Sequence, residues 1–244
     1  METRFVLRGV PGTALFTNHI VDDRRKGPYP TSPHIQQVQS GAWLLENNAI
    51  YTEYNNATYI ADHHVHGMAG AVGGQALGLW GIFASNDYIG GGGPFKQELT
   101  VHQNNVLLAM FEGNHYGSGS LHFAADEPWT KIYGPIFIAI NTGSSVEAVW
   151  SDAKKMAQEE VARWPYQWLH NAAYPLQRST VSGRIALTDG APTTGAWAIL
   201  APADENWTQV TKGYEFWSRV GAGGIFTIPK VRPGAYALLI VGAN

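Results

Sequence analysis

Titratable side chains are concentrated between Gly93 and Asn141, in a stretch that is otherwise apolar and rich in glycine. The stretch contains Lys96, Glu98, His102, Glu112, His115, Tyr116, His122, Asp126, Glu127 and Lys131. Imidazole, carboxylate, phenol and amine groups are the usual carriers of proton transfer, and they cluster at functional sites. Only 14% of the whole chain is charged, so this local density indicates an active or binding site.

Composition narrows the classes of function. The 16 Lys and Arg residues are outnumbered by 19 Asp and Glu residues, so we expect no basic groove for nucleic acid. Cysteine is absent, which excludes disulfides and thiolate metal sites. No apolar run reaches about 18 residues, so we expect no membrane span. The first residues, METRFVLRGVPG, lack the pattern of a secretory signal.

Two further motifs, a histidine pair and a glycine run, have residue types that occur in metal or phosphate sites. His64 and His66 share one face of an extended segment, together with Asp62, and imidazoles in that arrangement can hold zinc. Hydrogen-bonded histidines are more frequent, however, and no HExxH motif accompanies them, so we expect no metal. The run Gly90–Gly93 lacks the Gly-Lys-Ser/Thr sequence of a phosphate-binding loop and predicts a turn beside the site.

The elements that must position these residues are mostly strands. Alternating or continuous apolar runs predict strands at 4–10, 42–45, 49–60, 77–83, 99–111 and 132–140. The period of two places Glu53 on the same sheet face as Tyr51. One helix is predicted from Ser144 to about Trp164, because Ser144 and Glu147 have capping-box spacing and Pro165 ends the helical pattern. We expect this helix to pack against a sheet.

The pattern changes near Ser179 to short strands with tight turns, at 180–188, 197–200, 225–228 and 236–241. Such spacing predicts a small antiparallel β-sandwich. We therefore expect a boundary between 167 and 178, with one domain over 1–172 and a second over 173–244.

Several blocks then carry a family resemblance: KQELTVHQ, GNHYGSG, EPWTKIYGPIFIAIN, ARWPYQW, TVSGRIALTDG and GYEFWSRVGAGGIFTIPKVRPGAYAL. In order and spacing they resemble rhamnogalacturonan endolyase of the fourth polysaccharide lyase family, over nearly the whole chain. The resemblance implies a mostly β fold: the later part of a β-supersandwich (galactose-mutarotase-like) catalytic domain, followed by a fibronectin-III-like β-sandwich module. The start of the family's catalytic domain, its C-terminal carbohydrate-binding module and its secretion signal have no counterpart in the sequence.

The resemblance also implies a reaction, β-elimination in the rhamnogalacturonan I backbone of pectin next to galacturonic acid. A base must remove the weakly acidic proton at C5, and positive charge must stabilise the developing enolate. In the family a lysine and a histidine carry these roles. The GNHYG block places the histidine at His115, whereas Glu53 stands at the family lysine position, thirteen residues before His66. A carboxylate there would repel the galacturonate carboxylate.

The remaining site residues follow from the same resemblance. Arg8 is expected to meet the acidic sugar, His66 to line the sugar groove and Tyr116 to stack on a sugar ring. Lys96 or Lys131 could replace the missing cation. We expect a rhamnogalacturonan I partner, no cofactor, a monomer and, as in the family, a secreted protein.

Three functions stay open at this stage. The chain is a lyase of this family, or an impaired fragment or paralogue that only binds pectic polysaccharide, or a metal-dependent hydrolase that uses its histidines.

Overall fold

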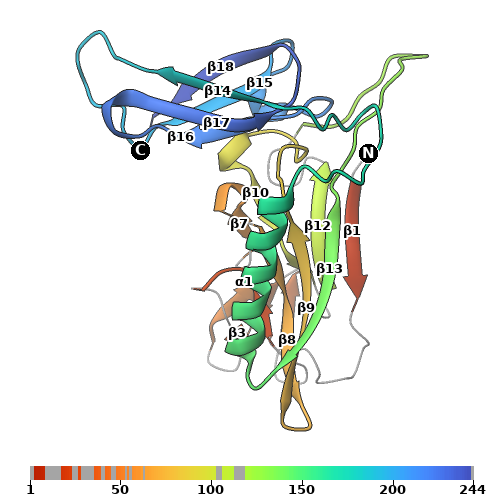
Figure 1. The fold of residues 1–244 in the computed structure, drawn as a ribbon. Helices are drawn as coiled ribbons and strands as arrows, with labels where there is room; N and C mark the ends of the chain where they lie inside the picture. The colour runs from red at the N-terminus through yellow and green to blue at the C-terminus, as the bar shows by residue number, and fades with distance from the viewer. Residues whose placement is uncertain are drawn as a thin grey trace.

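The computed structural model of the chain is mostly β, with one α-helix in its described part (Figure 1). It describes residues 3–8, 18–23, 27–28, 36–39, 42–44, 48–52, 54, 57–62, 64–102, 106–112 and 119–242. No helix among these residues has the length and apolar character needed to cross a membrane. The prediction of a mostly β fold is confirmed.

A five-stranded antiparallel sheet is the centre of the first part of the chain. Its strands, in spatial order, are β13 (Ile136–Gly143), β9 (Gln75–Phe83), β8 (Val65–Val72), β2 (Asn18–Ile20) and β3 (Gly27–Pro28). The long hairpin of β8 and β9 pairs Val65 with Ile82 and Val72 with Gln75. β13 pairs with β9 over its whole length, from Ile136 opposite Phe83 to Gly143 opposite Ala76.

Smaller sheets complete the first part. They are β1 (Thr3–Arg8) with β12 (Val106–Glu112) and β11 (Val101–His102), β10 (Gln97–Leu99) with β7 (Ala57–Tyr59), and β4 (Gln36–Gln39) with β5 (Ala42–Leu44) and β6 (Ile50–Thr52). The strand predicted over 49–60 is therefore wrong in length. Two short strands, β6 and β7, stand in its place, each paired with a different neighbour.

The helix α1 (Val146–Arg163) covers one face of the five-stranded sheet, as predicted. Its buried residues Val149, Trp150, Ala153 and Ala157 repeat at helical spacing and pack with Trp80 of β9. The rings of Trp80 and Trp150 lie 5.5 Å apart. The N-cap is Ser145 and not Ser144, because the Ser145 side chain accepts the Ala148 N–H at 3.1 Å.

The last part of the chain, Ser179–Val241, forms two antiparallel sheets and is called the C-terminal module below. One sheet pairs β14 (Ser179–Arg184) with β17 (Ile225–Val231), and the other orders β16 (Phe216–Arg219), β15 (Trp197–Pro202) and β18 (Tyr236–Val241). Buried residues from both sheets share one core, including Ala198, Leu200, Phe216, Phe226 and Ile228. This is the packing of a β-sandwich, as predicted.

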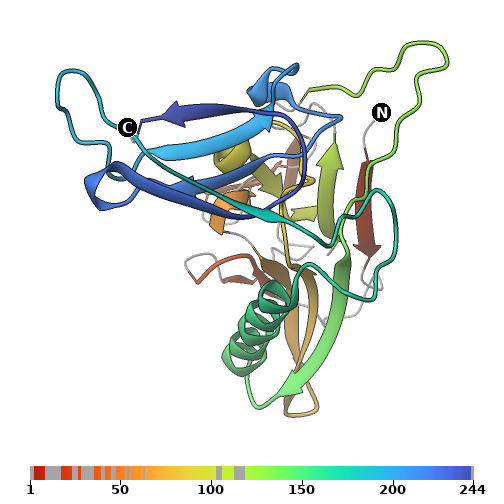
Figure 2. The ribbon, with the colours of Figure 1, turned by 45° about the horizontal axis from the view of Figure 1, so that its top comes forward.

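Short 3-10 turns connect several strands: η2 (Ile60–Asp62), η3 (Gly93–Phe95), η5 (Trp207–Gln209) and η6 (Ala222–Gly224). The C-terminal module lies across the end of the sheet and of α1, with η3 beneath it (Figures 1 and 2). Within the run Gly90–Gly93, the residues Gly90, Gly91 and Gly93 are buried and do not face open solvent. A Cβ atom added at Gly93 would lie 3.4 Å from Cγ2 of Ile199 in the module.

Candidate functional site: a pocket where the two parts of the chain meet

A buried ion pair joins the C-terminal module to the first part of the chain. Arg178, just before β14, donates to Asp87 Oδ2 at 3.0 Å, and the two side chains are only 3% and 8% exposed. The Arg178 guanidinium also lies over the Trp164 ring at 4.2 Å. A buried charge is tolerated where it is paired and hydrogen-bonded, so Arg178, Asp87 and Trp164 depend on each other's position.

The end of the titratable-rich stretch between Gly93 and Asn141 contacts the C-terminal module. Lys131 Nζ donates to the Thr211 carbonyl at 2.8 Å and lies 5.2 Å from the Tyr133 ring centre. Trp129 Nε1 donates to the Lys212 carbonyl at 3.2 Å. These contacts place Lys131 at the junction, where its ammonium group holds the module.

A β-bulge in β17 directs a second lysine across the junction. Ser179 pairs with Val231 and Val181 with Ile228, so Pro229 and Lys230 together stand opposite one residue of β14. Lys230 has φ of 57°, which is unusual for a residue with a side chain. Its ammonium group donates to the carbonyls of Val161, at 3.2 Å, and Trp164 at the end of α1. Burial, and then the nearby Arg178, lowers its pKa.

Glu215, in the segment before β16, reaches back to the glycine turn. Its Oε2 accepts the Gly93 N–H at 3.0 Å, and the residue is fully buried. Its Oε1 has no hydrogen-bond partner within the described residues. Burial raises the pKa of this carboxyl group to about 8, against lowering by the Gly93 hydrogen bond and by Lys131.

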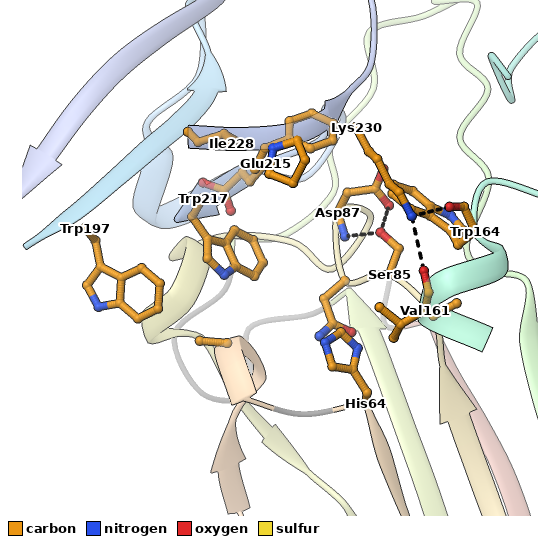
Figure 3. Close-up of a pocket in the computed structure, with 15 residues that line it drawn as sticks. His64, Ser85, Asp87, Val161, Trp164, Trp197, Glu215, Trp217, Ile228 and Lys230 are labelled. Atoms are coloured by element: carbon orange, nitrogen blue, oxygen red, sulfur yellow. Dashed lines mark hydrogen bonds between the residues drawn. The ribbon is translucent and has the colours of Figure 1, made fainter. Parts of the chain in front are cut away.

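Asp87, Trp164, Glu215 and Lys230 line a pocket of about 380 Å³ between the first part and the module, called the junction pocket below (Figure 3). Its lining is contributed by η2, the segment after β9, the end of α1, and β15, β16 and β17. The residues with polar or aromatic side chains are His64, Ser85, Asn86, Asp87, Trp164, Trp197, Glu215, Phe216, Trp217 and Lys230. The walls thus combine indole rings with hydrogen-bonding groups.

Several predicted site residues lie outside the part of the chain that the structure describes. These are Glu53, His115 and Tyr116, so their predicted roles stay predictions. The placement of Glu53 on a strand face with Tyr51 also stays untested. Their flanking strands are described: β6 ends at Thr52, directly before Glu53, and β12 ends at Glu112, three residues before His115.

The backbone of Arg8 is described, and it lies far from the end of β12 that leads to His115. Arg8 pairs with Val106, the first residue of β12, whereas Thr3 pairs with Glu112. Six residue steps of a strand span about 20 Å. Arg8 and Glu112 therefore lie at opposite ends of this strand pair, whereas His115 lies outside the described residues.

His66 and Lys96 are both buried. His66 has 0% exposure and stacks on Phe83, with ring centres 5.1 Å apart. Lys96 is 8% exposed and follows η3, with its backbone N–H donating to Gly93 O. The structure thus places Lys96 beneath the module, on the side of the glycine turn that faces Glu215.

The described residues contain no group of three His, Asp or Glu side chains that could hold a metal. His64 instead contacts the carbonyl of Phe83 through Nδ1 at 2.8 Å. Because a carbonyl only accepts, Nδ1 carries the proton in this bond and Nε2 is left as the acceptor of the neutral ring.

Sequence reasoning missed Arg178, Asp87, Glu215 and Lys230. The available signal was weak: Pro229-Lys230 interrupts an otherwise alternating strand, which is typical of a bulge. The other three are ordinary charged residues in sequence, and only the approach of the two parts of the chain buries them.

Residues 178–240 match the family model described as polysaccharide lyase family 4, domain II. A rhamnogalacturonate lyase of Dickeya dadantii is 37% identical to the chain over 210 residues, which is 86% of this chain and 34% of that protein. Rhamnogalacturonate lyase B of Emericella nidulans is 25% identical over 98% of this chain and 39% of its own length. A probable rhamnogalacturonate lyase B of Aspergillus niger is 24% identical over 94% of this chain and 35% of its own length.

The chain therefore spans a little over a third of the length of the curated relatives it matches. The matches confirm the resemblance found in the sequence motifs and support a partial rhamnogalacturonan lyase.

Proposed function

We infer that this chain is part of a rhamnogalacturonate lyase of the fourth polysaccharide lyase family, and we propose that it acts in β-elimination of the rhamnogalacturonan I backbone. The observation that carries the proposal is the 37% identity to a rhamnogalacturonate lyase over 86% of the chain. We propose the domains 1–172 and 173–244, and the family model described as domain II, which matches residues 178–240, supports a separate second domain.

The proposed reaction needs a proton acceptor and a proton donor. The base takes the proton from C5 of galacturonate, the electron pair forms the C4–C5 double bond, and the glycosidic bond to the C4 oxygen breaks. That oxygen then takes a proton. His115 is the proposed proton-transfer residue, because imidazole exchanges protons near neutral pH. Glu53 is the second proposed catalytic residue, at the position where the family has a lysine.

Substrate contacts are proposed for Arg8 and Tyr116, whereas His66 and Lys96, which are 0% and 8% exposed, are proposed to support the sugar groove from beneath. Guanidinium groups bind carboxylates well, so Arg8 is proposed to meet an acidic sugar of the polymer.

A polymer in the plant cell wall implies a secreted protein that binds carbohydrate and degrades the wall, and we propose this setting together with a monomeric state. The second candidate is a chain that only binds pectic polysaccharide. Glu53 favours it, because a carboxylate there removes the cation that stabilises the enolate. Lys131 is engaged with the Thr211 carbonyl, which further supports this alternative over a replacement lysine.

The test is the ultraviolet absorbance of de-esterified rhamnogalacturonan I, incubated with the chain and with its Glu53→Lys variant. Elimination creates a conjugated double bond, whereas hydrolysis does not. A rise in absorbance with the unchanged chain supports the lyase. A rise only with Glu53→Lys supports the binding-only candidate. No rise in absorbance with either the unchanged chain or Glu53→Lys, together with no binding of the polymer, would contradict the proposed function.

A further inference from the structure

The junction pocket has the size and the composition of a small-molecule site. Its volume of about 380 Å³ lies within the range of roughly 300–1,000 Å³ that is usual for ligand pockets. It lies between the C-terminal module and the end of α1, and such interdomain positions are frequent ligand sites. The described residues that line it come from segments other than β1 and β12.

Aromatic rings form one side of the pocket. Trp217 is the most accessible of its three indoles, since Trp164 and Trp197 are only 8% and 7% exposed. Figure 3 shows the Trp217 ring on the side opposite Ser85 and Asp87. The flat, apolar face of an indole packs against a ligand that has an apolar face and polar edges. A pyranose ring has both.

Hydrogen-bond donors and hydrogen-bond acceptors both lie opposite the aromatic side of the pocket. His64 donates through Nδ1 to Phe83, so its Nε2 accepts. Ser85 donates its hydroxyl to Asp87 Oδ1 at 2.8 Å and accepts the Asp87 N–H at 3.2 Å, which leaves one lone pair of its oxygen as an acceptor. Lys230 has three N–H donors and uses two of them on the carbonyls of Val161 and Trp164. A sugar hydroxyl, which donates and accepts, can match such a mixed set.

The charges of the lining argue against an acidic ligand. The two carboxyl groups, Asp87 and Glu215, are already on the wall, and Asp87 is neutralised by Arg178 behind it. Lys230 is the one cationic side chain among the described lining residues, and it is engaged with the end of α1. Burying a carboxylate without a dedicated cation is costly. The lining includes no arginine fork, which would bind a carboxylate at two points.

We propose that the junction pocket binds one neutral sugar residue, stacked on Trp217, with its hydroxyls against His64, Ser85 and Lys230. The source of this sugar rests on the proposed function: the neutral sugars of the pectic polymer on which the lyase acts. The site would hold a part of the polymer that lacks the carboxylate. The C-terminal module then contributes directly to polymer binding.

The test uses the purified chain with methyl α-rhamnoside, methyl β-galactoside and galacturonate as probes, and measures saturation-transfer NMR and titrated tryptophan fluorescence. Ala61→Phe fills the pocket from η2, whereas Ala71→Phe adds the same ring at an exposed site of β8. We expect a neutral glycoside to bind the unchanged chain and Ala71→Phe, and to bind Ala61→Phe at least about tenfold more weakly. His64→Phe, which keeps a ring but removes the acceptor, is the second variant and should weaken binding in the same direction.

The proposal would be overturned if Ala61→Phe and His64→Phe bound the glycoside as tightly as the unchanged chain does. Tighter binding of galacturonate than of the glycosides, or no binding of either glycoside, would also overturn it. Near-ultraviolet circular dichroism of each variant verifies that the fold is kept. The elimination assay, run on the same preparations, separates the two proposals. Glycoside binding without elimination leaves the pocket proposal standing and counts against the lyase, whereas elimination without glycoside binding has the reverse meaning.

Discussion

Arg178 and Asp87 are 91 positions apart in the sequence, yet their side chains meet at 3.0 Å with almost no exposure to solvent. Arg178 precedes the first strand of the C-terminal module, and Asp87 follows β9 of the central sheet. The pair therefore joins the module to the sheet at a point where both charges are almost completely shielded from solvent.

Asp87→Asn is expected to destabilise the chain by about 3 kcal/mol, because it leaves the Arg178 guanidinium buried without its counter-charge. Chemical denaturation measures the change in the free energy of unfolding. Glu159→Gln is the matched control, since the Glu159–Arg163 pair is exposed at 47% and 62% and should contribute less than about 0.5 kcal/mol. Equal effects of the two substitutions would contradict the importance of the buried pair.

Glu215 predicts a pH dependence of stability. Burial raises its folded-state pKa from 4.5 to about 8, so the folded chain binds this proton more tightly than the unfolded chain does. The stabilisation is fully present below about pH 4.5 and is lost as the pH rises through about 8, on the order of a few kcal/mol. Denaturation midpoints between about pH 5 and pH 9 measure this loss. Glu215→Gln should flatten the profile, and an unchanged slope would sink the assignment.

The hydrogen bonds of Lys230 to the end of α1 are expected to stabilise the folded chain. Lys230→Met should destabilise the chain by about 1 to 3 kcal/mol, because two carbonyls at the helix end, those of Val161 and Trp164, lose a charged donor. Lys155→Met, on the exposed side of α1, is the control and should change little. Thermal unfolding compares the two. A shift of the same size in both variants would show that the contact across the junction adds nothing.

The proposed role of His115 in proton transfer predicts a loss of elimination activity when it is replaced. If the chain, or its Glu53→Lys variant, shows elimination, His115→Ala should lower the rate by about 10²- to 10⁴-fold, the usual contribution of a general acid or base. His122→Ala is the control, because His122 is exposed in a segment along the module. Initial rates of absorbance increase are the measurement. An active His115→Ala variant would remove this histidine from the proposed mechanism.

Regular elements were predictable where the local pattern was long and strong. The helix was predicted nearly to its ends, because Val149, Ala153 and Ala157 repeat at helical spacing and Pro165 stops the pattern. The capping residue was wrong by one position, since both Ser144 and Ser145 suit an N-cap and only the backbone conformation selects between them. The run 49–60 was predicted as one strand because β propensity does not show where a chain changes its pairing partner.

The sequence alone determined the mostly β class of fold, and its motifs carried the family resemblance from which the residues proposed for catalysis follow, because these depend on local patterns and on motifs that are contiguous in the chain. Only the tertiary structure decided that Asp87, Glu215 and Lys230 line one pocket, with Arg178 paired to Asp87 behind it. Their neighbours come from segments that lie tens of residues apart, and their burial arises when the module packs on the sheet. Burial then changes what these charges do: it makes Arg178 and Asp87 depend on each other and raises the pKa of Glu215.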